Sequence, residues 1–206
     1  ILNLAHGTLF MLGTYMCYWI SSVVLTQASG GFWWSILLAP IAVAILGGII
    51  EVLLLRRIYD REHLDQYLMT FALVLVMGDL CKLAWGVDYN LVPVPWPLNG
   101  AVFFMGMPFP SYNMFLIVCG IAVFIGLWSL IRYTRLGMVI RAMTYNREMA
   151  SALGTNVPLV YTVVFMLGCW LAGLGGTLIV PTASAMPGMD MIVLIECFII
   201  IVVGGL

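Results

Sequence analysis

The most informative absence in this sequence is charge. Of 206 residues, eight are Lys or Arg and nine are Asp or Glu, so charged residues make up 8% of the chain and hydrophobic residues 64%. In an ordinary soluble domain about a quarter of the residues are charged. The composition therefore excludes a soluble domain and indicates an integral membrane protein. The net charge of −1 gives no sign of a nucleic-acid partner.

The sequence also lacks the motifs of common enzymes, metal sites and redox sites. It contains no GxxxxGK[ST] phosphate loop, no HExxH, no GxSxG and no CxxC. The five cysteines are scattered through apolar segments, which disfavours a disulfide framework and a zinc site. We therefore expect no enzyme, no catalytic residue, no cofactor and no metal on this chain. If ATP drives the process, the nucleotide and its magnesium bind to another subunit.

Long apolar runs dominate the chain. A helix of about 20 apolar residues crosses a membrane core about 30 Å thick. Six runs are candidates, at approximately 4–25, 35–55, 67–86, 112–131, 158–180 and 191–206. The predicted fold is all-α, a polytopic transmembrane helical bundle that forms one domain over 1–206. The chain lacks an initiator Met and begins and stops inside apolar runs, so we expect a fragment that lacks both ends.

Basic residues gather in two connections between these runs. Segments 56–66 and 132–157 together hold seven of the eight Lys and Arg residues, which predicts that both face the cytoplasm. Two spans separate them, so the topology is consistent. The connection 87–111 holds five of the nine prolines and no Lys or Arg, as expected for an external loop. Glycines at 47, 48, 168, 173, 175 and 176 favour close helix packing over the alternative, a hinge beside a transport path.

The second basic connection also predicts an amphipathic helix. Residues 141–153 are good helix formers, and Gly154 and Pro158 supply stop signals. The predicted apolar stripe is Met143, Met149, Ala150 and Leu153, beside Arg147 and Glu148. Such a helix either lies on the lipid headgroups or docks in a groove of a soluble partner.

Ionisable residues inside membrane spans are costly and point to function by default. The candidates are His6, Glu51, Asp79, Lys82, Asp190 and Glu196. Asp79 and Lys82 are three residues apart, which favours a structural ion pair over a role in a transport path. We expect Asp190 at the membrane boundary, capping the helix that follows. Glu196 has no basic residue near it in the sequence, so it pairs across helices, faces water or is protonated.

The opening LNLAHG places Asn3 and His6 beside Gly7 at the head of an apolar run. Such a pair either makes an ordinary interhelical contact or belongs to a broken helix whose backbone groups face a cavity. The sequence leaves both interpretations open.

Three segments together resemble the permease subunits of the branched-chain amino acid (Liv-type) ABC importers. They are LNLAHGTLFMLGTY at 2–15, IRYTRLGMVIRAMTYNREMASALGTNV at 131–157 and IIVVGGL at 200–206. The most specific blocks are NLAHG and RAxxxNxxxASxLG. The resemblance covers essentially the whole chain, with the first and last helices of the family missing.

The resemblance implies a multi-pass permease of a bacterial or archaeal cytoplasmic (inner) membrane. It implies a second permease subunit, two cytoplasmic ATPase subunits, a periplasmic or lipid-anchored solute-binding protein and membrane lipid as partners, and no nucleic acid. It also makes the second basic connection the element that couples ATP hydrolysis to transport. The coupling residues it implies are Arg141, Asn146, Arg147, Glu148, Ala150, Ser151, Leu153 and Gly154.

Candidates for the translocation path are Asn3, His6, Gly7 and Glu196. On the frequency of substrates in the family, we expect branched-chain or related small amino acids. Relatives that resemble this family carry urea or short amides, so that substrate class is one alternative. An ion-coupled secondary transporter, with Asp79, Glu196 and His6 as relay residues, is the other.

Overall fold

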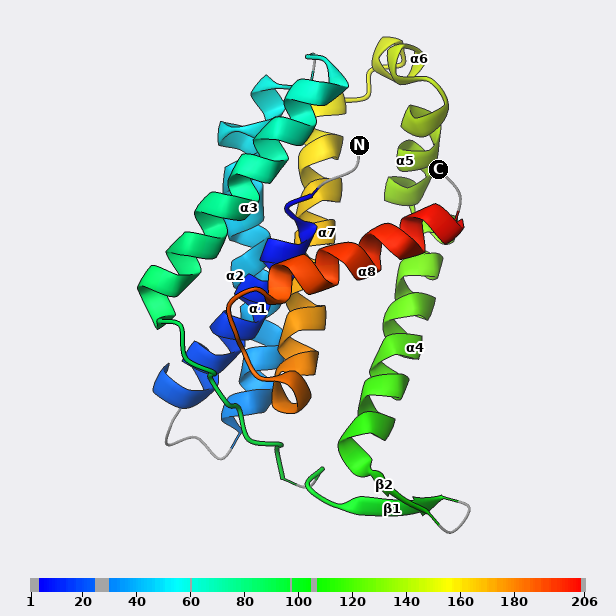
Figure 1. Ribbon diagram of the computed structural model, residues 1–206. Coiled ribbons are helices and arrows are strands. Elements are labelled where there is room, and N and C mark those ends of the chain that lie inside the picture. The colour runs from blue at the N-terminus through cyan, green and yellow to red at the C-terminus, as the bar shows by residue number, and fades with distance from the viewer. Residues whose placement is uncertain (1–3, 25–29, 60, 97, 105–106, 205–206) are drawn as a thin grey trace. The chain divides into compact units, whose positions relative to one another are not determined.

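The structure, a computed structural model, describes residues 4–24, 30–59, 61–96, 98–104 and 107–204 (Figure 1). These residues are mostly helical, which confirms the predicted all-α class. They form two compact units: the first contains Ile1–Pro93 and Phe165–Leu206, and the second Val94–Val164.

Four of the predicted spans are confirmed. Within the described ranges, four helices are long and apolar enough to cross a membrane: Gly31–Arg57, Leu64–Trp85, Ser111–Tyr133 and Val157–Ala183. The first and last predicted spans correspond to shorter helices, α1 (His6–Trp19) and α8 (Met189–Gly204).

The first unit contains five helices or parts of helices among its described residues. They are α1 (His6–Trp19), which continues as a π-helical turn over Ile20–Val24; α2 (Gly31–Leu53), followed by a 3-10 turn over Leu55–Arg57; α3 (His63–Trp85); the part of α7 (Val157–Ala183) from Phe165 onward; and α8 (Met189–Gly204). α1 packs against α2, α3 and α8.

Glycines set the close packing of α7 on α1 and α2. A Cβ atom on Gly176 would collide with the backbone oxygen of Phe10 in α1, and one on Gly47 with the sulfur of Cys169. Gly48, Gly173 and Gly175 also have close neighbours on another helix. The packing interpretation is therefore confirmed for the glycines at 47, 48, 173, 175 and 176. Gly168 differs, because nothing lies within 4 Å of its Cβ position.

A short non-helical segment separates α7 from α8. Ser184 and Gly188 have φ angles of 58° and 88°, so the backbone leaves the helical conformation on both sides of Ala185. Ala185 and Asn90 exchange two backbone hydrogen bonds of 2.9 Å, which hold this segment to the connection after α3. α8 then starts at Met189 and crosses α1 (Figure 1).

The second unit begins with a small antiparallel hairpin, β1 (Ala101–Phe104) and β2 (Met107–Pro110). The sequence predicted only a proline-rich loop here. α4 (Ser111–Tyr133), α5 (Arg135–Tyr145) and α6 (Arg147–Ala152) follow, and α7 begins in this unit.

The prediction of one continuous helix over 141–153 is wrong. The backbone at Asn146 is extended, with φ −155° and ψ 104°, so α5 ends before it and α6 starts after it. The Asn146 side-chain oxygen accepts a hydrogen bond of 2.9 Å from the Met149 backbone N–H. This is the N-cap role that asparagine favours over a helix-interior position. α5 also begins earlier than predicted, because Thr134 caps it through the Gly137 N–H.

Candidate functional site

The segment formed by α5 and α6 has one face anchored by apolar side chains. Met143 of α5, Ala150 of α6 and Val157 at the start of α7 are buried against one another. Val139, Val160 and Tyr161 pack against this cluster. Met143 and Ala150 were predicted to share an apolar stripe with Met149 and Leu153. The latter two are exposed, so the predicted stripe is not one buried face.

Three large apolar side chains of the same segment are exposed. Tyr145 is 96% exposed and Leu153 is 81% exposed, with Met149 between them also exposed. Single exposed apolar residues are ordinary, whereas a group of three around a short helix indicates a binding surface. We call Tyr145, Met149 and Leu153 the exposed apolar row.

Aromatic and backbone contacts hold the basic side chains of this region. Arg147 lies over the ring of Tyr161, with its guanidinium carbon 5.3 Å from the ring centroid. Arg132 lies in the same way over Trp128, at 5.5 Å. Arg141 donates a hydrogen bond to the backbone oxygen of Ile131 near the end of α4. Arg147 therefore joins α6 to α7, and Arg141 joins α5 to α4.

The remaining residues predicted for coupling lie in or beside α6. Glu148 and Ser151 are exposed on the helix, and Asn146 caps it. Gly154 follows the helix with φ +85°, a left-handed conformation in which glycine is favoured. The structure thus places Arg141 on α5 and the other predicted coupling residues in or beside α6, and their role in coupling stays a prediction.

The predicted path residues lie on α1 and α8. Asn3 lies outside the described residues. His6 is the half-buried first residue of α1, and Gly7 is buried where a Cβ atom would collide with the backbone oxygen of Asp190. Glu196 is exposed on α8, on the side opposite to Leu194, which faces Gly7. A role for these residues in the path stays a prediction.

A second group of polar side chains lies where α1, α3 and α8 meet. Asp190 is only 6% exposed, in the first turn of α8 rather than before the helix as predicted. Tyr15 of α1 is fully buried, and its ring stacks on Trp85 of α3 with centroids 5.4 Å apart and planes at 26°. Asp190 is close enough to interact electrostatically with Tyr15 and with Cys81 of α3. We call Tyr15, Cys81, Trp85 and Asp190, with Gly78, the polar centre.

Sequence reasoning missed most of this polar centre. Tyr15 stands in an apolar run with nothing to single it out, and Asp190 was assigned to the membrane boundary. One signal was present: Gly78, Cys81 and Trp85 are spaced by three and four residues and so share one face of α3.

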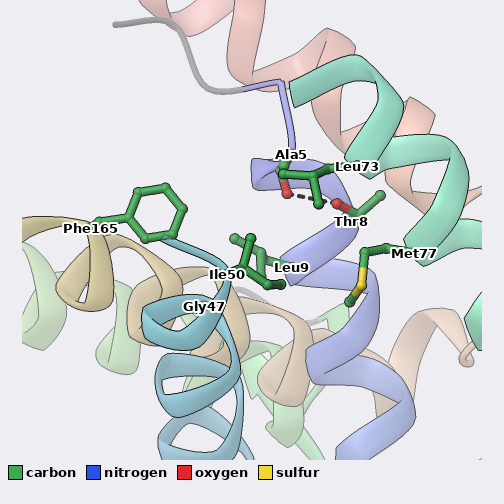
Figure 2. A pocket seen from close by; sticks show the side chains of 8 residues that line it. All are labelled: Ala5, Thr8, Leu9, Gly47, Ile50, Leu73, Met77 and Phe165. Carbon is green, nitrogen blue, oxygen red and sulfur yellow. Dashed lines mark hydrogen bonds between the residues drawn. The ribbon is translucent and has the colours of Figure 1, made fainter. Parts of the chain in front are cut away.

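A small cavity near the start of α1 is too small for a substrate. Figure 2 shows its lining, which consists of Ala5, Thr8, Leu9, Gly47, Ile50, Leu73, Met77 and Phe165. The Thr8 hydroxyl donates to the Ala5 backbone oxygen at 2.7 Å, so it offers no free donor there. The space open to a water-sized sphere is about 10 Å³, which is at most one water molecule. The cavity is therefore a packing gap in this conformation.

Comparison with protein families gives a match over the whole chain. Residues 1–206 match the family described as "Branched-chain amino acid transport system / permease component".

Curated relatives are similar at low identity. "High-affinity branched-chain amino acid transport system permease protein LivH" of Salmonella typhimurium is 24% identical, covering 87% of this chain and 60% of its own length. LivH of Escherichia coli K12 is 22% identical with the same coverage. BraD of Pseudomonas aeruginosa, also a high-affinity branched-chain amino acid permease protein, is 23% identical over 100% of this chain and 70% of its own. The chain thus spans about 60% of the length of the LivH proteins. No solved structure shows significant similarity.

Proposed function

Because the chain belongs to the family of permease components of branched-chain amino acid transport systems, we propose that it is the permease subunit of an ABC importer. It moves branched-chain amino acids inward by alternating access, and partner ATPases supply the energy. Family membership also identifies the chain as a transport protein rather than an enzyme, and with the four candidate spans it confirms a multi-pass inner-membrane location.

The exposed apolar row is the observation that carries this proposal. Tyr145 and Leu153 are highly exposed on a segment whose Met143 and Ala150 side chains pack against the start of α7. Such a segment offers a partner an apolar surface and a rigid attachment to a membrane span. Helix-in-groove docking needs an apolar surface on a helix. The exposed apolar row provides such a surface, and a charged, mobile loop would not.

The anchoring of α6 suggests how movement of the partner reaches the membrane. The buried cluster around Ala150 and the contact of Arg147 with Tyr161 fix α6 on α7. A partner that binds the row differently in its two nucleotide states shifts the equilibrium between two orientations of α7. ATP and magnesium bind to the two ATPase subunits, and this chain carries the mechanical connection.

The proposal also specifies the other partners. A second permease subunit completes the membrane pathway, and an external solute-binding protein delivers the substrate. The printed names of the relatives describe high-affinity branched-chain amino acid transport, which supports this substrate class.

The test compares apolar side chains on opposite sides of the membrane. Full-length protein carrying Tyr145→Ser and Leu153→Ser is expected to lose a co-purifying ATPase while its level in the membrane is unchanged. The matched control is Leu91→Ser, because Leu91 is 74% exposed in the connection after α3, on the opposite side in the predicted topology. Retention of the ATPase by the double variant would contradict docking at this row.

Uptake measurements separate the alternatives. An ABC importer continues to transport when an uncoupler collapses the ion gradient at constant ATP, whereas an ion-coupled secondary transporter stops. A competition experiment tests the substrate class. If excess urea or acetamide abolishes the uptake of labelled leucine and excess isoleucine does not, the chain belongs to the urea and short-amide class instead.

A further inference from the structure

We propose that the polar centre is the site at which the permease receives the ammonium group of its amino acid substrate. This inference rests on the proposed transport function and names the residues that recognise one end of the substrate. The argument concerns α1, α3 and α8 of the first unit, apart from the coupling segment.

A carboxylate buried as deeply as Asp190 needs compensation. Moving a charge out of water is costly unless it is paired, hydrogen-bonded or neutralised. Among the described residues the ion pair present is that of Lys82 with Asp79, at 2.9 Å. Lys82 also interacts electrostatically with Asp190, so one ammonium group serves two carboxylates. The amide groups of the first turn of α8 compensate part of the charge. A cationic ligand would complete the compensation.

Tyr15 supplies an independent sign of an incomplete site. Its hydroxyl is buried and has no hydrogen-bond partner among the described residues. A buried hydroxyl normally has a partner, so an orphan is a candidate for a ligand contact. The ring itself is held in place, because it stacks on Trp85.

Gly78 brings the backbone of α3 close to the carboxylate. A Cβ atom at this position would be in ordinary van der Waals contact with Asp190 Oδ2, at 3.7 Å, and would have no other described side chain or neighbouring helix within 4 Å. The carboxylate therefore faces α3 at a position that carries no side chain.

The chemistry of these groups favours an organic ammonium. One carboxylate, one hydroxyl and two aromatic rings are what recognises an alkylammonium ion, since the rings add cation–π attraction. A calcium ion would need six to eight oxygen ligands, more than the centre offers. Asp190 would repel a carboxylate. Pairing the substrate ammonium with Asp190 neutralises both charges before the substrate enters the apolar part of the membrane.

The first experiment uses the complete transporter, with both permeases, the ATPases and the loaded binding protein, in proteoliposomes. Asp190→Asn is expected to lower leucine uptake at least about tenfold, as expected for losing a hydrogen bond between charged groups. ATP hydrolysis stimulated by the loaded binding protein should persist, which shows that the complex is assembled. Asp190→Glu should restore part of the uptake. Asp88→Asn, an exposed acid in the connection after α3, is the matched control and should behave as wild type.

The second experiment separates binding from folding at Tyr15. Tyr15→Phe keeps the stacked ring and removes the orphan hydroxyl, so the empty protein should be as stable as wild type or more so. The KM for leucine should nevertheless rise several-fold with kcat unchanged. A purely structural tyrosine would not shift stability and KM in opposite directions.

The third experiment identifies the end of the substrate that the site binds. Binding of labelled leucine to the permease–ATPase complex without the binding protein is competed with isopentylamine, which lacks the carboxylate, and with 4-methylpentanoate, which lacks the ammonium. We expect competition by the amine, lost in Asp190→Asn. Competition by the acid alone, or unchanged uptake in Asp190→Asn, would overturn the ammonium site and leave the transport function standing. A wild-type complex that transports no branched-chain amino acid would instead refute both.

Discussion

Gly13 of α1 lies against the backbone of Gly173 in α7. A Cβ atom on Gly13 would lie 2.6 Å from the backbone oxygen of Gly173 and 2.7 Å from its Cα. The atoms that this Cβ would meet belong to the backbone, which cannot move aside as a flexible side chain can. The packing of α1 on α7 therefore depends on the absence of a side chain at Gly13, whereas a Cβ atom on Gly173 would meet Val43 and Pro40 of α2.

Gly13→Ala is expected to destabilise the protein by about 1–3 kcal/mol, the usual effect of overpacking a closely packed interior. The matched control is Gly168→Ala in α7, where the Cβ position is open and alanine gains helix propensity, so stability should be unchanged or higher. The free energy of unfolding in mixed micelles measures both. Equal effects of the two substitutions would show that α1 and α7 are not in close contact.

Asn146→Ala should loosen α6 by removing its cap. The Asn146 side chain accepts the Met149 N–H at 2.9 Å, and loss of an N-cap costs about 0.5–2 kcal/mol. We expect faster hydrogen exchange at the Met149 amide and weaker coupling of ATP hydrolysis to uptake. Asn146→Asp keeps an acceptor at the same place and should preserve both. An unchanged exchange rate in Asn146→Ala would contradict the break between α5 and α6.

The ion pair of Asp79 and Lys82 allows a double-mutant test of whether the two charges act only on each other. Their side chains are 2.9 Å apart on an outward face of α3. Asp79→Asn or Lys82→Met alone leaves an uncompensated charge on a membrane span, so the level of inserted protein should fall. The double variant should recover that level and transport normally. Transport that stays lost at full membrane level would instead place the pair in a substrate or ion path.

Much of the fold could be predicted from composition and periodicity. Four spans appear close to their predicted positions because a membrane helix is specified by a continuous run of apolar residues, a local property. The Asp79–Lys82 pair was predictable for the same reason, since residues three apart on a helix are neighbours. The break at Asn146 was missed, although an asparagine N-cap is a local signal, because good helix formers flank it on both sides.

The polar centre shows what the sequence could not supply. More than sixty residues separate Tyr15 from Gly78, and more than sixty separate Gly78 from Asp190. Each of these residues alone has an ordinary local explanation. Their proximity depends on how α1, α3 and α8 pack, and that packing depends on contacts such as Gly7 against the Asp190 backbone.

The sequence by itself determined that this protein is an integral membrane protein, where its spans lie and to which family it is similar, because hydrophobicity and local motifs act over one helix at a time. Only the tertiary structure decided which side chains of α6 are anchored, and which buried acid interacts with a tyrosine whose hydroxyl has no hydrogen-bond partner in the part of the chain that the structure describes. Those relationships arise from close packing between distant segments, and local sequence patterns do not encode which side chains will share one small volume.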